Sequence, residues 1–599
     1  MNLTAEQKAI GKDNYYEAMG VTRRNFMKEI AAAGAVTGAG LGGMYFNYQK
    51  VGDPLRVGVI GTGDEGQVLM GAISPDYVQV VAIADIRPYN IHRAFHGDWA
   101  SDVSLYARPG LISKYKWNTE DEARKHVKVY DQDYHDLLND KDVEAVIIAL
   151  PLHLHAKVAI EAMMKGKHVL CEKLMAHNVA QCKLMAQVAD QQKKLLAVGH
   201  QRHYSVLYDN AKWLIKQGLL GQVHHIRAQW HRDNLPGGDS WQQPLPGGEM
   251  GWIQKGEEYQ RVLIDKIGQR VTEYKKALDK EKDPTKVRLL EKRLAQWEAW
   301  DKDKGLKPED FGYQNFQLGN EKRTALEELC RWRLWERTGG GLMAELGSHQ
   351  LDAASIFVSA LRGDGEKVHP LTVHAIGGRH IFPIDRHAED HVYCMFEFPG
   401  QKYDYNFDVG YRDEMTNTPD PQKGVPSYEQ DPEKRVVVTY SSIMGNGYGG
   451  YGEVVMGTKG TMILEREQEV MLYKNSDTSS RVSVKSEKGA SVLDTQASGS
   501  PAAAVAKAAD TGPISRGYTE EIEHWAWCIR NNAAPKDLHC HPAIALGDAV
   551  IALTSNVAIR KCRAGEAGFV KFEKGWFDVN DPSTPDGSNI DSEKQQMMS

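Results

Sequence analysis

The clearest chemical signal in the sequence is a glycine-rich loop followed by an acidic residue. The loop reads Gly61-Thr-Gly-Asp-Glu-Gly66 and directly follows the apolar run 55–60, which predicts a buried strand. In such a strand–loop–helix turn the first glycine permits the tight turn, the second lets the backbone approach a pyrophosphate, and the third allows close helix packing. Asp85, 24 residues after Gly61 (85 − 61), would hydrogen-bond the adenosine ribose and repel a 2′-phosphate. These residues predict a bound nicotinamide dinucleotide, NAD rather than NADP, although Arg87 is placed where an arginine can accommodate the phosphate.

Two later motifs carry side chains suited to acid–base chemistry. One is Gly166-Lys-His-Val-Leu-Cys-Glu-Lys173, and the other is Gly339-Gly-Gly-Leu-Met-Ala-Glu-Leu-Gly-Ser-His349-Gln-Leu-Asp352. With the glycine loop, these motifs resemble the Gfo/Idh/MocA oxidoreductases, in which a Glu-Lys-Pro motif ends a strand beside the nicotinamide. The resemblance covers roughly residues 55–208, 223–232, 339–357 and the final helices from Tyr518.

The resemblance implies an oxidoreductase that acts on a secondary alcohol of a sugar or polyol. Oxidising such an alcohol requires a base for the hydroxyl proton while hydride leaves for the nicotinamide. We expect His349 to titrate near neutrality and to be this acid–base group, while Lys173 hydrogen-bonds the same oxygen and stabilises negative charge. Glu345 would orient the substrate or the histidine, because i, i+4 spacing places both side chains on one helix face.

The sequence departs from the family pattern at two of these positions. Leu174 stands where a proline usually follows the lysine, which argues against the cis peptide bond that this proline often supports. Glu345 stands where the family usually has aspartate, and its longer side chain would shift the geometry or the choice of substrate.

Other candidate ligands are expected at the ends of strands, where two domains would meet. The predicted cofactor-binding residues are Gly61, Thr62, Gly63, Asp64, Glu65, Gly66, Asp85, Ile86, Arg87, Leu150, Pro151, His155, Glu172, Lys173, Gln201 and Arg202. The predicted substrate-binding residues are Lys173, Tyr204, His231, Arg232, Glu345 and His349.

Histidines and cysteines do not form a convincing metal motif. The pairs His153/His155 and His224/His225 and the run His539-Cys-His541 lack a full ligand quartet, so we predict no metal. The seven cysteines are scattered and odd in number, which is not the pattern of a disulfide framework.

The order of apolar runs predicts an α/β fold followed by an α+β fold. In residues 54–204, short strands alternate with helices, which indicates a Rossmann domain with a doubly wound parallel sheet that binds NAD(P). Residues 205–580 predict a substrate-binding α/β domain with a large, mainly antiparallel open sheet. The expected strands are 55–60, 78–83, 145–150, 168–171 and 195–199 in the first domain and 223–231, 392–398, 403–409, 435–440 and 460–464 in the second.

An insertion at about 239–323 interrupts the second domain. Apolar stripes at 263–278 and 287–297 predict a helical hairpin, which we expect to be a packing appendage or a subunit contact rather than a lid over the substrate cleft. The polar segments 413–434 and 474–515 predict loops, and residues 581–599 predict a disordered tail.

The first 50 residues contain a twin-arginine motif, Thr22-Arg-Arg-Asn-Phe-Met-Lys28, before a weakly apolar stretch that ends at Phe46. We predict that residues 1–50 are a leader for the twin-arginine export machinery and that the protein is periplasmic or exported. No clear cleavage site is present, so an uncleaved leader could anchor the protein to the membrane. An exported enzyme of this kind would carry its NAD tightly bound.

Composition limits the partners of the chain. The net charge of −7 over 599 residues argues against a nucleic-acid-binding surface. The partners expected are a sugar or glycoside substrate, the export machinery and, from the family resemblance, further copies of the same chain.

Two other functions remain open from sequence. A glycosidase of this fold oxidises a sugar hydroxyl transiently, eliminates the glycosidic substituent, adds water and reduces the ring again, which leaves NAD unchanged. Many such relatives carry a twin-arginine leader, but their Glu-Lys motif is usually replaced, so Lys173 favours a dehydrogenase. The third possibility is a non-catalytic sugar or dinucleotide sensor, against which the leader, Lys173 and His349 all argue.

Overall fold

A six-stranded parallel sheet forms the first domain, with strand order β3-β2-β1-β4-β5-β6. This order confirms the predicted doubly wound sheet, and it opens a crevice where β1 and β4 lead to opposite sides. The computed structural model describes residues 3–19, 46, 48–362, 367–403, 433–487, 490–495 and 516–598. The strands are β1 (Leu55–Ile60), β2 (Val78–Ala84), β3 (Lys128–Tyr130), β4 (Ala145–Ile148), β5 (His168–Glu172) and β6 (Leu196–Gly199). The helices are α4 (Asp64–Ala72), α5 (Pro88–His96), α6 (Asp102–Ala107), α7 (Gly110–Tyr115), α8 (Glu120–Ala123), α9 (Tyr134–Asn139), α10 (His155–Met164) and α11 (Val179–Gln191).

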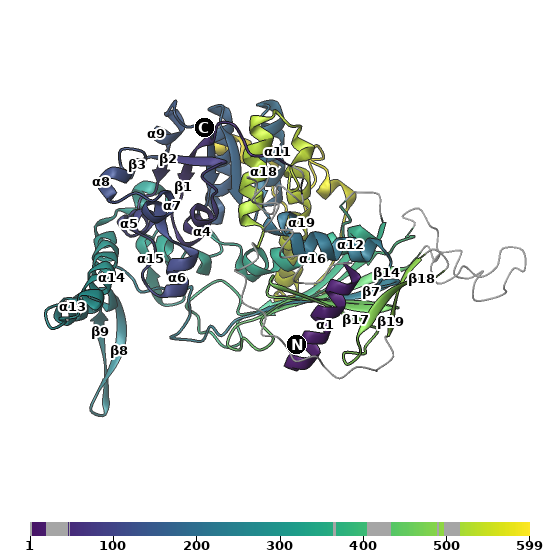
Figure 1. Ribbon diagram of the computed structural model, residues 1–599. Coiled ribbons are helices and arrows are strands. Elements are labelled where there is room, and N and C mark those ends of the chain that lie inside the picture. The colour runs from purple at the N-terminus through teal and green to yellow at the C-terminus, as the bar shows by residue number, and fades with distance from the viewer. Residues whose placement is uncertain are drawn as a thin grey trace, which may run out of the picture.

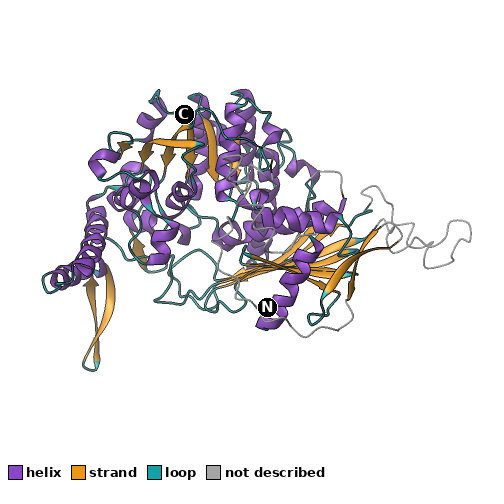
Figure 2. Cartoon of the chain, viewed as in Figure 1, coloured by secondary structure: helices purple, strands orange, loops and turns teal. Residues whose placement is uncertain are grey.

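A mixed eight-stranded sheet forms the second domain, with strand order β17-β16-β15-β7-β14-β13-β12-β20. Every neighbouring pair is antiparallel except β7 and β14, as the sequence led us to expect. Helices α12, α16 and α19 contact this sheet (Figures 1 and 2). The strands are β7 (Val223–His231), β12 (Thr372–Gly378), β13 (His391–Pro399), β14 (Arg435–Ile443), β15 (Tyr451–Gly457), β16 (Gly460–Glu465), β17 (Glu469–Lys474) and β20 (Phe569–Lys571). The helices of this part of the chain are α12 (Val206–Lys216), α15 (Ala325–Cys330), α16 (Ser348–Arg362), α18 (Tyr518–Arg530) and α19 (Pro542–Arg563), of which α18 packs on α4 and the first sheet. The expected strand 403–409 lies outside the described residues, apart from Tyr403.

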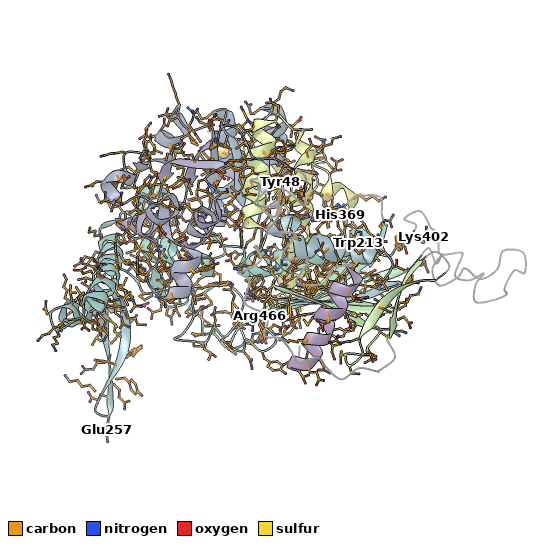
Figure 3. All side chains as sticks on the ribbon, in the orientation of Figure 1. Tyr48, Trp213, Glu257, His369, Lys402 and Arg466 are labelled. Atoms are coloured by element: carbon orange, nitrogen blue, oxygen red, sulfur yellow. The ribbon has the colours of Figure 1, made fainter. Side chains whose placement is uncertain are left out.

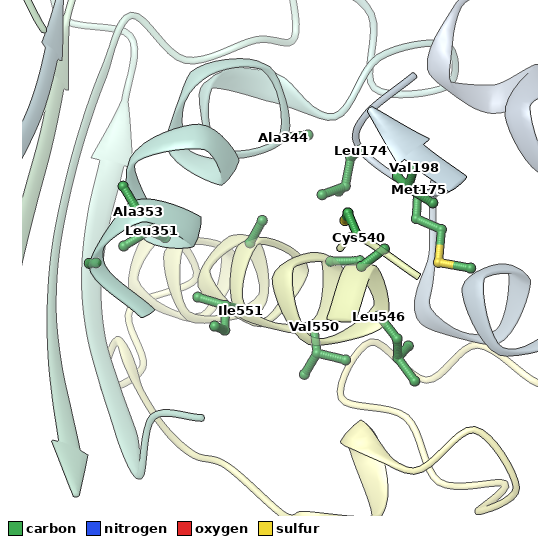
Figure 4. Close-up of a cluster of buried hydrophobic side chains, with 14 of the residues drawn as sticks. Leu174, Met175, Val198, Ala344, Leu351, Ala353, Cys540, Leu546, Val550 and Ile551 are labelled. Carbon is green, nitrogen blue, oxygen red and sulfur yellow. The ribbon is translucent and has the colours of Figure 1, made fainter. Parts of the chain in front are cut away.

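Helix α19 joins the two domains through a buried apolar cluster. Leu546, Val550 and Ile551 on this helix lie in one cluster with Leu174 of the first domain and Ala344 of the second (Figure 4). The helix is long and apolar enough to cross a membrane, but most of it is buried inside the fold. Its composition therefore fits the core helix of a two-domain body.

The insertion contains a β-hairpin as well as the expected helices. Strands β8 (Glu249–Lys255) and β9 (Glu258–Ile264) form the hairpin, which precedes α13 (Lys266–Leu278) and α14 (Pro284–Lys302). Leu263, which the sequence placed on a helical stripe, lies in β9 instead, where it is exposed and pairs with Met250 of β8. The hairpin projects away from the body, with Glu257 at its tip (Figures 1 and 3).

Two segments predicted to be irregular are folded. The expected disordered tail is wrong, because the carboxyl-terminal segment lies along the start of α11 and ends in α20 (Ile590–Met598). There Glu593 accepts hydrogen bonds from Asn178 and Gln181, and Asp586 accepts one from the amide of Val179. The expected loop 474–515 contains a hairpin formed by β18 (Val482–Glu487) and β19 (Ala490–Thr495). Both segments are rich in polar residues, so the sequence did not predict that they are folded. Their order depends on contacts with residues far away in the chain.

The predicted leader span, residues 1–50, contains folded segments on both sides of the twin-arginine motif. Helix α1 (Ala5–Ala18) packs on β17 and β18 of the second domain, and Tyr48 is buried with its hydroxyl bonded to Glu523. The twin-arginine motif between them lies outside the described residues. The segments on either side of this motif are therefore part of the folded body.

Asn14 is the polar anchor of α1. Its Nδ2 donates to the carbonyls of Leu472 and Ser480 at 3.0 and 3.2 Å, and its Oδ1 accepts from the amide of Val482 at 2.9 Å. Only 1% of the residue is exposed, so no water can replace these bonds without rearrangement.

We predict that Asn14→Ala lowers the free energy of unfolding by about 3 kcal/mol, because buried backbone groups lose their partners. Urea denaturation of Glu17→Ala, an exposed position on the same helix, serves as the matched control and should change stability by less than about 0.5 kcal/mol. Equal stability of the two variants would show that α1 is not anchored as described.

Candidate functional site

A cavity of about 620 Å³ links the glycine loop to the start of α16. Most of the residues predicted to bind the cofactor line it, and the insertion and its flank supply another wall. Predicted residues on the lining are Gly61, Gly63, Asp64, Glu65, Asp85, Ile86, Arg87, Leu150, Pro151, His155, Glu172, Lys173 and Glu345. Residues from the insertion and its flank are Gln243, Asp310, Phe311, Gly312, Tyr313, Leu329, Cys330, Trp332 and Arg333.

The glycine loop has the shape of an anion cradle. Gly61 has φ +89°, and a Cβ at Gly66 would lie 2.1 Å from the carbonyl oxygen of Gly61, so both positions require glycine for backbone reasons. A Cβ at Gly63 would meet only the Asn90 amide nitrogen, at 3.8 Å, which leaves open space above the loop. Helix α4 begins here without a side-chain cap, so its first amides remain available to a diphosphate.

Two carboxylates in the first turn of α4, Asp64 and Glu65, would repel such an anion, and the charge of each is reduced in a different way. Asp64 pairs with the Arg93 guanidinium at 2.7 Å, which balances its charge. Burial raises the pKa of Glu65 above its usual range, which favours the neutral acid. The cradle is therefore less negative than the sequence Asp-Glu suggests.

Asp85 is held at the end of β2 by the loop itself. Its Oδ2 accepts hydrogen bonds from the amide and hydroxyl of Thr62, at 2.8 and 3.1 Å, and from Asn90 at 3.1 Å. Its Oδ1 accepts from the amide of Arg87 at 2.9 Å. The carboxylate is thus preorganised on the cavity wall, where the predicted contact with a ribose would be made.

Lys173 reaches across the domain boundary. Its Nζ donates to the carbonyl oxygen of Glu345 at 2.9 Å. The peptide between Lys173 and Leu174 is cis although leucine stands in place of the proline that often supports this bond in the family. The His155 ring lies between the carbonyls of Leu174 and Leu150, at 2.8 and 2.9 Å, and links the two chain segments that flank the cavity.

Glu345 lies on a π-turn, Met343–Gly347, at the start of α16. Its Oε1 accepts from the Arg333 Nε at 2.6 Å. Burial alone would raise the pKa of Glu345, but Arg333 and Lys173 together lower it to about 2. Glu345 is therefore a permanent anion in the cavity at physiological pH.

His349 does not share the position of Glu345. The π-turn replaces the regular helix that the i, i+4 argument assumed, and of the two side chains only Glu345 lies on the cavity lining. His349 is 7% exposed, and its ring centroid lies 5.4 Å from that of Trp230. Burial, with Lys173 and Arg202 nearby, holds its pKa well below the usual range, so the expectation that it titrates near neutrality is wrong.

The remaining predicted ligands lie outside the cavity lining. Gln201 and Arg202 are buried in a short turn, where Arg202 pairs with Glu467 at 2.7 Å and bonds to the carbonyl of His349. Tyr204 is fully buried, and its ring stacks on that of His539 at 4.8 Å. These three side chains follow the end of β6 but point into the domain interface. Their position after a strand therefore did not predict whether they reach the cavity.

His231 and Arg232 lie at the far end of β7. The His231 ring bonds to the carbonyl of Tyr448 and the hydroxyl of Ser441 at 2.9 and 3.0 Å, which occupies both of its nitrogens. Arg232 lies over the Trp230 ring at 5.6 Å and contributes to the low pKa of Glu345. Of this pair, only Arg232 is electrostatically linked to the cavity.

Several cavity residues were not predicted from the sequence, because they belong to the insertion or its flank. Arg333 is the most consequential, because it fixes the side chain of Glu345. The only sequence signal for it is the Arg- and Trp-rich run 331–335 that precedes Gly339.

A buried polar cluster behind His349 contains potential metal ligands. His200, Asp352 and Asp548 each place one ligand atom within 4.8 Å of the others. Lys367 already donates to Asp352 at 3.2 Å and also to Asp548, and His203 bonds to Asp352 at 2.8 Å. Because Lys367 supplies positive charge to both carboxylates, we assign the cluster a structural role.

Comparisons with known proteins agree with the geometry of the first domain. Residues 55–200 match the Gfo/Idh/MocA family model, described as an oxidoreductase family with an NAD-binding Rossmann fold. The inositol 2-dehydrogenase of Salmonella typhimurium is 32% identical over 173 residues, which cover 28% of this chain and 43% of that protein. The inositol 2-dehydrogenase/D-chiro-inositol 3-dehydrogenase of Lactiplantibacillus plantarum is 37% identical over 109 residues, or 18% of this chain and 30% of that protein.

The matched segments thus span less than half the length of these curated relatives. Among solved structures, scyllo-inositol dehydrogenase from Lactobacillus casei with NAD(H) and scyllo-inositol aligns with a TM-score of 0.45 and 14% identity. That alignment covers 87% of this chain and 99% of that one. Residues 55–200 are thus similar to the NAD-binding Rossmann domain of the Gfo/Idh/MocA oxidoreductases.

Proposed function

We propose that the protein is an NAD-dependent oxidoreductase that acts on a secondary alcohol of a polyol, cyclitol or sugar. The observation that carries this proposal is the single cavity that contains the glycine cradle, Asp85, Lys173 and Glu345. A dinucleotide bound to the cradle and Asp85 would place its reactive end toward Lys173. The inositol dehydrogenases among the relatives support the class of substrate.

Each charged side chain of the cavity has a separate role in this proposal. NAD, when bound, supplies the acceptor for the hydride. Lys173 uses one of its three ammonium N–H groups in the hydrogen bond to the Glu345 backbone carbonyl. Two N–H donors therefore remain to hold the reacting oxygen. Arg333 keeps Glu345 in one orientation, where its second oxygen can accept a hydrogen bond from a neighbouring substrate hydroxyl.

We retain His349 as the proposed acid–base group, although its ring lies outside the cavity lining and is linked to Lys173 through the charge of the lysine. Its low pKa keeps the ring neutral, and its Nδ1 has no hydrogen-bond partner among the described residues. A neutral imidazole with a free nitrogen can accept a proton, and its low pKa makes it a weak base that would hold the proton only transiently. The neighbouring positive charge of Lys173 would favour rapid release of that proton from the His349 ring.

Tight binding of NAD is part of the proposal. Ile86, beside Asp85, packs against a cluster that includes Phe311, Tyr313 and Leu329. These residues of the insertion and its flank also line the cavity, so they would cover the adenosine end of a bound dinucleotide. The insertion was expected to be a packing appendage or a subunit contact, but these residues place it at the cofactor end of the cavity.

The decisive experiment follows absorbance at 340 nm as the purified protein meets cyclitols, sugars and aryl glycosides. We expect a cyclitol or sugar to reduce the cofactor and Lys173→Met to slow this at least about 100-fold, because a donor to the developing charge is lost. Lys165→Met, an exposed lysine outside the cavity lining, should retain wild-type turnover. Cleavage of aryl glycosides without net NADH would instead establish the glycosidase, and normal turnover by Lys173→Met would overturn the role given to that lysine.

We also propose that the protein is exported through the twin-arginine route with its leader retained. The motif at residues 22–28 supports export, and α1, which precedes it, packs on the second domain. Removal of the leader would uncover β17. The intact mass of protein recovered from the periplasm should therefore include residues 3–19, and a mature chain that begins after residue 46 would contradict retention.

A further inference from the structure

An arginine beside the cofactor pocket is paired with a carboxylate from the insertion. The Arg87 Nε donates to the Asp303 Oδ2 at 2.8 Å, and the two side chains are 10% and 0% exposed. Arg87 follows Asp85 by two residues and lines the cavity. It is therefore the cation nearest in sequence to the carboxylate predicted to hold the adenosine ribose.

Asp303 is fixed in this position by several contacts. Its Oδ1 accepts from the amide of Tyr89 at 3.0 Å, so the carboxylate caps the start of α5 as well as pairing with Arg87. Trp300, one turn earlier on α14, stacks on the Tyr89 ring at 4.4 Å and 11°. Gln296 on the same helix bonds to the amide of Trp99 at 2.7 Å and to Asp98 at 3.0 Å. The end of α14 is thus locked onto α5.

Two carboxylates contact Arg87, while the other arginine on this part of the lining, Arg93, pairs with Asp64 and Asp98. Asp85 and Asp303 lie on either side of Arg87, bonded respectively to its amide and to its Nε. The Arg87 Nη2 is buried and has no hydrogen-bond partner among the described residues. Donors on the guanidinium thus remain for a ligand, but its charge is already balanced by Asp303, which suits a neutral hydroxyl better than a dianionic phosphate.

We propose that Asp303 determines the dinucleotide preference of this protein. By pairing with Arg87, it removes the positive charge that would hold the 2′-phosphate of NADP, and it leaves Arg87 able to donate only to the ribose hydroxyl of NAD. The inference rests on the proposed function, because it assumes that a dinucleotide occupies the cavity. It gives the insertion a role in specificity in addition to that of Asp85.

The test compares dissociation constants for NAD and NADP in the full-length protein by isothermal titration calorimetry. Asp303→Asn keeps an oxygen for the Tyr89 amide but removes the charge, so the ratio of the NADP to the NAD constant should fall at least about tenfold. Asp301→Asn is the matched control, because Asp301 pairs with Lys304 rather than with Arg87, and its ratio should match that of the wild type. In Asp303→Asn/Arg87→Gln the gain should vanish, since the freed guanidinium is gone. An unchanged ratio in folded Asp303→Asn would overturn the proposal.

Arg87→Gln alone provides a test that does not depend on the stability of Asp303 variants. We expect it to change the NADP affinity by less than about threefold, because the paired arginine contributes little to phosphate binding. A loss of tenfold or more would show that Arg87 grips the phosphate despite Asp303, and it would overturn the inference. If the wild type binds neither dinucleotide, the proposed function itself fails, and this result is distinct from NAD binding with an unchanged ratio.

Discussion

The site depends on the apolar contact that α19 makes with both domains. Leu174 and Met175, directly after Lys173, lie in the same buried cluster as Ala344, the neighbour of Glu345 (Figure 4). Because α19 packs against both, the lysine at the end of one sheet and the π-turn at the edge of the other are held together. The hydrogen bond from Lys173 to the Glu345 carbonyl is a consequence of this packing. Loosening the cluster would separate the two halves of the cavity before it unfolded either domain.

Burying so many polar groups at a domain interface requires that each charge has a partner. Arg333 balances Glu345, Arg202 is paired with Glu467, and Lys367 serves Asp352 and Asp548. An unpaired charge in such a place costs several kcal/mol, so these pairs constrain how the domains can meet. The same rule explains why Arg202, predicted as a ligand, is a structural residue: its charge is used within the interface.

The sequence predicted the parts of the fold and site that local patterns determine. The glycine loop, Asp85 and Lys173 could be placed because each directly follows a buried strand, and parallel strands bring such positions to one edge. Glu345 was located by its motif, but the π-turn that separates it from His349 has no periodic signature. Asp303 could not be predicted, because it comes from an insertion whose docking on α5 depends on side-chain packing, and Arg333, in the flank of the insertion, contacts Glu345 only through the tertiary fold. The order of α1 and of the tail likewise depends on contacts with residues hundreds of positions away.

The central claim is that the open space above Gly63 holds the diphosphate of a dinucleotide. The most direct test titrates NADH into wild-type protein and Gly63→Val and follows nicotinamide fluorescence. A valine at Gly63 meets little protein but fills the cradle, so we expect at least about a 100-fold weaker affinity with an unchanged melting temperature. Gly52→Val, where an added Cβ meets no protein atom within 4 Å, is the control and should bind NADH as the wild type does. Equal NADH affinity in Gly63→Val and wild type would contradict the account.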